Sequence, residues 1–354
     1  MMNTFTFPGI PQRVVFGSGT LAQTAEEVQR LGHDKALVLS GPNQRDAAEA
    51  LAAQLGALSA GVFAGAAMHT PVDVTEAAMA QFRASGATAV VGLGGGSTVG
   101  LAKAIAARSG ADQVVIPTTY AGSEMTDILG ETQDGEKTTR RSPEIRPETV
   151  IYDVDLTLGL PVEMTVTSGM NALAHAMEAL YAPDLNPVLE LLCKDALVAF
   201  RNGLPTVIRE PRNVEGRTQA LYGAWACSTA LGHVSMALHH KLAHTFGGTF
   251  GTPHADTHAI LLPYTTAFNE VAVPERLAPI AETFGGGSAG TGLWDFAGEI
   301  GAPRSLQGIG ITEADLDRAA DVAVKNTYPN PRKFDRAAIR ELLQQAWSGE
   351  RPKP

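Results

Sequence analysis

Residues 87–97 read ATAVVGLGGGS, an apolar run that ends in three glycines and a serine. The apolar part predicts a buried strand, and the glycines allow positive φ and close approach of the backbone to a ligand. Residues 99–108 then have a helical pattern, and a helix N-terminus offers N–H groups that favour phosphate. A tight turn for strand–helix packing would need similar residues. We predict a dinucleotide pyrophosphate site at Gly94, Gly95, Gly96 and Ser97.

The flanking sequence repeats this strand-then-helix rhythm. Further strands are predicted at 35–41, 61–65 and 113–119, and helices at 46–55 and 72–85. Such alternation implies a parallel sheet with helices on both faces, and ligands bind at the carboxyl ends of its strands. Residues 1–160 are therefore predicted to form an α/β, Rossmann-like dinucleotide-binding domain.

After residues 149–161 the strand-like pattern disappears. Helical periodicity predominates in the rest of the chain, so residues 161–354 are predicted to form an all-α domain. The predicted helices cover 170–181, 187–202, 215–244, 314–325 and 335–347.

Composition limits the classes of function. The net charge of −10, without any Lys/Arg run, argues against a nucleic-acid partner. No apolar run reaches the ~18 residues of a membrane helix, and no signal peptide is evident. Cys193 and Cys227 lack metal-type spacing, which is typical of reduced thiols in a cytoplasmic protein.

Two further loops extend the predicted cofactor site. Thr118, Thr119 and Ser123 follow the strand at 113–119, and their hydroxyls are candidates to bond ribose or phosphate, although ordinary turns use the same residues. Ser40 and Asn43 follow the strand at 35–41, where an acidic residue would exclude the 2′-phosphate of NADPH. We therefore expect either NADH or NADPH to be used.

Histidines gather in the helical half, with six of the nine between positions 233 and 258. His240 and His244 lie one helical turn apart, as do Asn171 and His175, so that His175, His240 and His254 can converge. A divalent metal would favour a carboxylate at position 171, so the amide weakens a metal site without forbidding it. Without a metal, the imidazoles become donors to carboxylates or an oxyanion, and Lys241 and Arg332 add positive charge.

Six segments in order resemble one known family. They are GGGSTVGLAKAIA, PTTYAGSEMT, GEKTTRRSPEIRPETVIYDVDLTLGLP, TSGMNALAHAMEALYA, HHKLAHTFGGTFGTPHADTHAILLP and NPRKF, which together span residues 92–334. The set is similar to the iron-containing alcohol dehydrogenase superfamily and, within it, to the maleylacetate reductases. The metal-dependent members carry aspartates where this chain has Gly100 and Asn171, and their other three ligand positions correspond to His175, His240 and His254.

The resemblance implies a fold like that of dehydroquinate synthase, with the active site in a cleft between the two domains, and a homodimer. The implied reaction is the NADH- or NADPH-dependent reduction of the conjugated C=C bond of maleylacetate, a small dicarboxylate, to 3-oxoadipate without a metal. His244 and His254, supported by His240 and His175, are expected to stabilise the enolate or a carboxylate. Lys241 or Arg332 is expected to hold the second carboxylate, and Lys137 to contact the cofactor.

Other classes of function remain open. One is a metal-dependent alcohol or aldehyde dehydrogenase of the same superfamily, against which Asn171 argues. Another is a non-catalytic dinucleotide-binding or redox-sensing protein, against which the dense histidine cluster argues. A metal-bound cyclase or lyase on the same scaffold is the most distant alternative.

Overall fold

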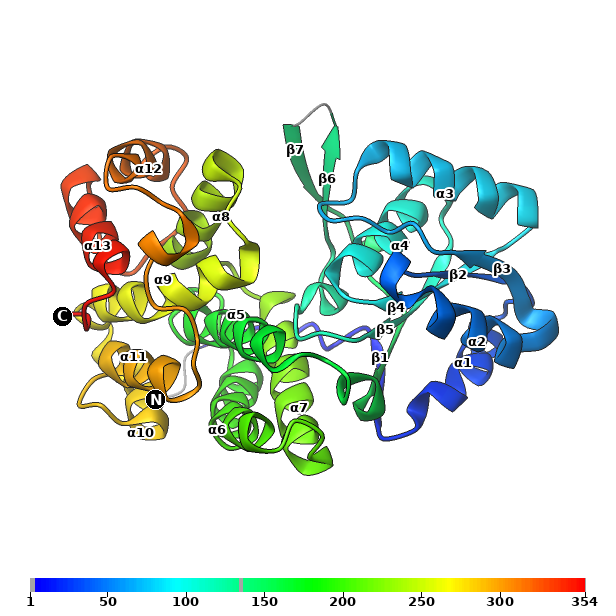
Figure 1. Ribbon diagram of the computed structural model, residues 1–354, viewed down its shortest axis with the longest axis horizontal. Helices are drawn as coiled ribbons and strands as arrows, with labels where there is room; N and C mark the ends of the chain where they lie inside the picture. Colours follow the sequence, from blue (N-terminus) through cyan, green and yellow to red (C-terminus); the bar gives the residue numbers. More distant parts are fainter. Residues whose placement is uncertain (1–3, 134–135, 354) are drawn as a thin grey trace. The chain divides into compact units, whose positions relative to one another are not determined.

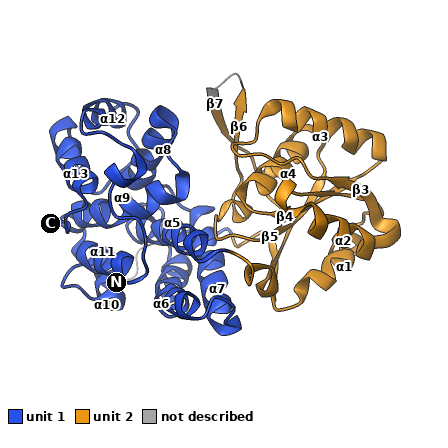
Figure 2. Ribbon diagram, in the orientation of Figure 1, with its two compact units in different colours: residues 1–8, 161–354 blue, residues 9–160 orange. Residues whose placement is uncertain are grey.

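The computed structural model describes residues 4–133 and 136–353, which fall into two compact units (Figure 1, Figure 2). Gly9–Leu160 form the α/β unit. Pro161–Pro354, with the N-terminal residues through Pro8, form the helical unit. None of the described helices is long and apolar enough to cross a bilayer.

A six-stranded sheet, in which every pairing is parallel, organises the α/β unit. Its spatial order is β1-β8-β5-β4-β2-β3. The strands are β1 (Arg13–Gly17), β2 (Ala36–Leu39), β3 (Ser59–Phe63), β4 (Ala89–Gly94), β5 (Asp112–Pro117) and β8 (Thr149–Asp153). The parallel sheet confirms the predicted fold class. The strand order reverses direction between β2 and β4, which is where α/β sheets bind ligands.

Alternation along the strands builds two cores, one on each face of the sheet. Leu37 and Leu39 of β2 pack with α3 (Val72–Ser85) and α4 (Gly96–Ser109). Val38, between them, packs on the other face with α1 (Thr24–Arg30) and α2 (Arg45–Leu55). Because successive side chains point to opposite faces, a strand buried on both sides reads as the continuous apolar run ALVL.

A separate antiparallel pair also belongs to the α/β unit. β6 (Ile128–Gln133) pairs with β7 (Glu136–Arg141), and the sequence analysis did not predict these two strands.

Nine described helices form the helical unit (Figure 2). They are α5 (Val162–Leu180), α6 (Pro187–Arg209), α7 (Val214–Leu231), α8 (Leu238–Phe250), α9 (His254–Glu270), α10 (Pro274–Phe284), α11 (Ala289–Glu299), α12 (Asp315–Ala323) and α13 (Arg336–Ser348). α9 packs against α5, α8, α11 and α13. Every residue from Thr257 to Asn269 of α9 is buried. This enclosure explains why the sequence of α9 shows no amphipathic stripe and escaped prediction.

The predicted single helix over 215–244 is wrong, because α7 ends at Leu231 and α8 begins at Leu238. Gly232 follows α7, and both the backbone N–H and the hydroxyl of Ser235 bond the Asp184 carboxylate at 2.8–3.0 Å. This distant carboxylate holds the chain out of the helix, so the break cannot be read from local propensity.

Candidate functional site

The glycine turn lies at the carboxyl end of β4. Gly94 has φ +157°, and a Cβ added there would overlap the Thr98 hydroxyl and lie 2.9 Å from Gln44 Oε1. α4 begins two residues later, at Gly96. The position therefore requires glycine, and the first-turn N–H groups of α4 lie where a pyrophosphate would accept them. These residues fit a bound dinucleotide.

The loop after β5 lies beside this turn, as the sequence predicts. The backbone N–H of Thr118 donates to the Gly94 carbonyl at 3.1 Å. The Thr118 hydroxyl accepts from Gln44 Nε2 at 3.0 Å. A Cβ on Gly95 would lie 3.1 Å from Thr119 Cγ2. The ends of β2, β4 and β5 thus form one continuous polar rim.

The other residues predicted to bind the cofactor differ in their exposure to solvent and in their hydrogen bonds. Ser40 is fully buried, and its hydroxyl has no hydrogen-bond partner among the described residues. Asn43 is exposed in the turn after β2. Lys103 Nζ donates to both the carbonyl of Ser123, at 2.6 Å, and its hydroxyl. Lys137 belongs to β7, and its side chain lies outside the described part of the structure.

Lys103 is a buried cation that the sequence analysis did not single out. It belongs to α4, is fully buried, and also donates to Thr126 Oγ1 at 2.8 Å and to the Ile128 carbonyl at 2.9 Å. Burial lowers the pKa of Lys103 to about 7. Lys103 thus links α4 to the loop that follows β5, and these two segments both contribute to the predicted cofactor site.

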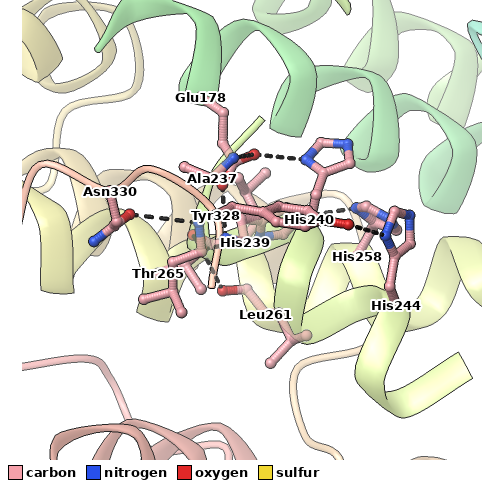
Figure 3. Close-up of polar contacts among 12 residues, drawn as sticks. Glu178, Ala237, His239, His240, His244, His258, Leu261, Thr265, Tyr328 and Asn330 are labelled. Carbon is pink, nitrogen blue, oxygen red and sulfur yellow. Dashed lines mark hydrogen bonds and ion pairs between the residues drawn. The ribbon is translucent and has the colours of Figure 1, made fainter. Parts of the chain in front are cut away.

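Three helices of the helical unit build the histidine cluster, of which Figure 3 labels His239, His240, His244 and His258. α5 supplies His175, α8 supplies His239, His240 and His244, and α9 supplies His254 and His258. The distances between ring centroids are 5.3 Å for His175 and His240, 4.9 Å for His240 and His258, and 4.4 Å for His254 and His258. The His244 ring lies 6.1 Å from that of His240, so the four predicted catalytic histidines gather in one place, with His258 between His240 and His254.

A directed hydrogen-bond chain runs through the buried part of the cluster. The Thr265 hydroxyl donates to the Leu261 carbonyl at 3.0 Å, so it accepts from His239 Nδ1 at 2.9 Å. His239 Nε2 then accepts from His258 Nδ1 at 2.8 Å. This order leaves His258 Nε2 as an acceptor, and it has no partner among the described residues.

Burial keeps the inner histidines uncharged. It lowers the pKa of His175, His239 and His258 well below the usual value, and the neighbouring imidazoles add to the effect. His244 and His254 are exposed. The cluster thus presents neutral imidazoles inside and accessible rings at its edge.

Position 171 lacks the carboxylate that a metal ion at the cluster would favour. Asn171 is buried, its Oδ1 has no partner among the described residues, and its amide contributes no charge. Across residues 4–133 and 136–353, no three His, Cys, Asp or Glu side chains form a group that could hold a metal.

Tyr328 adds a phenol that the sequence analysis missed. Its hydroxyl lies 3.4 Å from His244 Nδ1 (Figure 3). Lys241 Nζ lies 5.9 Å from the centroid of the Tyr328 ring. Lys241 is half-buried, and burial lowers its pKa. Tyr328, His244 and Lys241 thus make a polar edge to the cluster. No local signal marks position 328, because only the tertiary fold brings it to α8.

Arg332 is not brought to the cluster, contrary to the expectation. Its guanidinium stacks on Phe268 at 4.1 Å and donates to the Phe268 carbonyl at 2.9 Å. Phe268 lies near the end of α9, 14 residues beyond His254 and roughly 20 Å along the helix at about 1.5 Å per residue. Arg332 anchors the segment that carries Tyr328 instead.

Two family models together match most of the chain. The Fe-containing alcohol dehydrogenase family, C-terminal, matches residues 165–347, and the iron-containing alcohol dehydrogenase model matches residues 11–154. Maleylacetate reductase from Rhizobium sp. (strain MTP-10005) is 57% identical, covering 99% of this chain and 100% of the relative. Maleylacetate reductase 1 from Rhodococcus opacus is 50% identical, covering 98% of each chain. The crystal structure of maleylacetate reductase from Agrobacterium tumefaciens has a TM-score of 0.97 and 56% identity, covering 99% of this chain and 100% of that one.

Proposed function

The chain belongs to the iron-containing alcohol dehydrogenase family, and from that premise we propose that it is a maleylacetate reductase. The reaction is the NADH- or NADPH-dependent reduction of the C=C bond of maleylacetate to 3-oxoadipate, a step in the bacterial degradation of aromatic compounds. The observation that carries the proposal is the identity of 57% to a maleylacetate reductase over the full length of both chains.

We assign the cofactor to the α/β unit and the substrate chemistry to the helical unit. The glycine turn at Gly94 fits the pyrophosphate, and the loop at Thr118 and Thr119 supports ribose binding. When bound, the nicotinamide supplies a hydride to the alkene carbon β to the ketone. Negative charge then develops on the ketone oxygen as an enolate, and uptake of a proton at the carbon next to the ketone gives 3-oxoadipate.

The residues of the cluster provide what that enolate requires. Ring N–H groups of His244 and His254 are the donors available to the developing oxyanion, and each such hydrogen bond strengthens as charge builds up. Lys241 is placed to attract a substrate carboxylate, because its ammonium lies at the edge of the same cluster. His175 and His258 are neutral, so these two inner imidazoles add no charge of their own beside the substrate.

We further propose that the reaction needs no metal, that two copies form a homodimer, and that the enzyme works in the cytoplasm. Asn171, in place of a carboxylate, supports the first point. Cys193 and Cys227, both free and buried, support a reducing location.

The test is NADH oxidation by chelator-treated protein with maleylacetate as substrate. Rapid consumption would support both the reaction and its independence of metal. Activity that appears only after iron or zinc is added would refute the metal-free mechanism. No activity under either condition would refute the reaction, and small alcohols and aldehydes would be screened next for the metal-dependent alternative.

A further inference from the structure

A carboxylate lies buried behind the histidine cluster. Glu178, near the end of α5, is fully buried, and the sequence analysis assigned it no role. It stands three residues after His175 and seven after Asn171, which places all three on one face of α5. A buried carboxylate is costly unless its oxygens are bonded, so its partners show what it does.

Four hydrogen bonds converge on Glu178, and Figure 3 shows the one to the His240 ring. Oε1 accepts from the backbone N–H of His239 at 2.6 Å and from the Tyr181 hydroxyl at 3.3 Å. Oε2 accepts from the backbone N–H of Ala237 at 2.7 Å and from His240 Nδ1 at 2.7 Å. Both oxygens are thus used, and three of the four donors come from the first turn of α8 or the residue before it.

The backbone bonds give α8 the cap that its own sequence lacks. The N-cap residue is Ala237, which has no side chain able to accept a hydrogen bond. Glu178 accepts two of the N–H groups that begin the helix, and its negative charge suits the positive end of the helix dipole. The start of α8 is therefore fixed relative to α5, and with it the backbone of His240.

The fourth bond fixes the ring of His240. With Nδ1–H donated to a carboxylate, Nε2 is the ring nitrogen left for other partners, and the neutral tautomer is defined. His239, the preceding residue, differs because its Nδ1 bonds the neutral Thr265 hydroxyl. In catalytic triads, a buried carboxylate that accepts Nδ1–H orients the imidazole and stabilises positive charge on it.

We propose that Glu178 is a positioning residue for the reduction: it holds the His240 imidazole so that Nε2 is presented to the reacting substrate. The inference rests on the proposed function, because it assigns His240 a part in that reaction. Glu178 itself touches no substrate, so it acts through α8, and chiefly through the His240 ring that it bonds directly.

A double-mutant cycle tests this route. Glu178→Gln should lower kcat by about 100-fold or more, because the neutral amide cannot accept all four bonds or support charge on the imidazole. In a His240→Ala background, the same substitution should cause a much smaller loss, the part that comes from the start of α8 alone. Tyr181→Phe removes the longest bond to Glu178, together with a bond from Asn269 Nδ2, and should leave kcat near the wild-type value because Asn269 keeps its bond to Asn330. Equal losses from Glu178→Gln in both backgrounds would overturn the proposal.

A spectroscopic readout separates this proposal from the reaction itself. In the wild-type protein, the His240 Nδ1 proton should be strongly deshielded in the NMR spectrum, and Glu178→Gln should move or remove that signal. Absence of such a proton in the wild type would overturn the proposal even in an active enzyme. Inactivity of the wild type towards maleylacetate would refute the proposed function, while the resonance still reports on the Glu178–His240 bond. If Glu178→Gln does not fold, Glu178→Asp, which keeps the charge but shortens the reach, takes its place in both measurements.

Discussion

Gln44 Nε2 donates to the Thr118 hydroxyl at 3.0 Å, which links the turn after β2 to the loop after β5. β4 lies between those two strands in the sheet, so the bond passes across its carboxyl end, where Gly94 stands. The reversal in strand order falls at the same place. The glycine, the bridging amide and the threonine therefore form one site, and a side chain at position 94 would disturb all of it.

Gly94→Ala should weaken cofactor binding. The backbone has φ +157°, and the new Cβ would collide with Thr98 and Gln44. We expect the Kd for NADH to rise by at least about 10-fold and the free energy of unfolding to fall by about 1–3 kcal/mol. Fluorescence titration and urea denaturation measure the two effects. Gly159→Ala is the matched control, because a Cβ there meets nothing within 4 Å and its backbone is not in the positive-φ region. Unchanged NADH affinity in Gly94→Ala would contradict the pyrophosphate assignment.

His244→Ala should lower turnover by about 100-fold, the usual effect of a missing acid–base or oxyanion partner. The ring is exposed at the edge of the cluster, and its Nδ1 lies 3.4 Å from the Tyr328 hydroxyl. NADH binding should persist, because the glycine turn belongs to the other unit. Steady-state kinetics with a parallel NADH titration would show this. His33→Asn, which alters a histidine of the α/β unit, is the control. Wild-type turnover in His244→Ala would exclude the role.

Lys241→Met should raise KM for maleylacetate by about 10- to 100-fold, because a charged hydrogen bond to a carboxylate is worth about 1.5–3 kcal/mol. Lys241 Nζ lies by the Tyr328 ring, within the polar edge of the cluster. Arg332→Ala should instead lower stability with little change in KM, because its guanidinium is engaged with Phe268. Initial rates over a range of maleylacetate concentrations and thermal melts compare the two variants. A KM increase confined to Arg332→Ala would reverse this assignment.

Residues 87–97 allowed the sheet and the cofactor turn to be predicted, because an apolar strand and its glycines depend on neighbouring residues alone. The histidine cluster was also accessible, since the i, i+4 spacings of His175 and His240 place their partners on one helix face. The role of Glu178 was not accessible, because its partners lie about 60 residues away in the sequence. Arg332 was expected at the cluster because it lies in a family motif. A motif does not show which end of α9 a residue contacts.

Lys103→Met should change the pH dependence of stability. Burial lowers the pKa of Lys103 to about 7 in the folded protein, below the usual 10.5. Between pH 7 and pH 10.5 the unfolded chain binds more protons at this lysine than the folded protein does. The buried lysine therefore destabilises the folded state fully below pH 7, and progressively less as the pH rises to about 10.5. The free energy of unfolding of the wild type, minus that of Lys103→Met, should therefore rise by up to about 1.4 kcal/mol per pH unit in this range. Urea denaturation of both proteins at several pH values measures the difference. A flat difference would mean that Lys103 keeps its ordinary pKa.

NADH and NADPH should both support turnover, with kcat/KM values within about 10-fold of each other. An acidic side chain after β2 would bond the ribose 2′-hydroxyl and repel a 2′-phosphate. This chain has Ser40 there, followed by Gly41, Pro42, Asn43 and Gln44, so no carboxylate stands in the turn. Arg45 begins α2 directly afterwards and is exposed, which supplies positive charge near the expected place of a 2′-phosphate. Initial rates over a range of NADH or NADPH concentrations, at saturating maleylacetate, give the two kcat/KM values to be compared. A preference for NADH above about 100-fold corresponds to about 2.7 kcal/mol of discrimination against NADPH. The residues of this turn do not provide that energy, so such a result would mean that a group elsewhere excludes the 2′-phosphate.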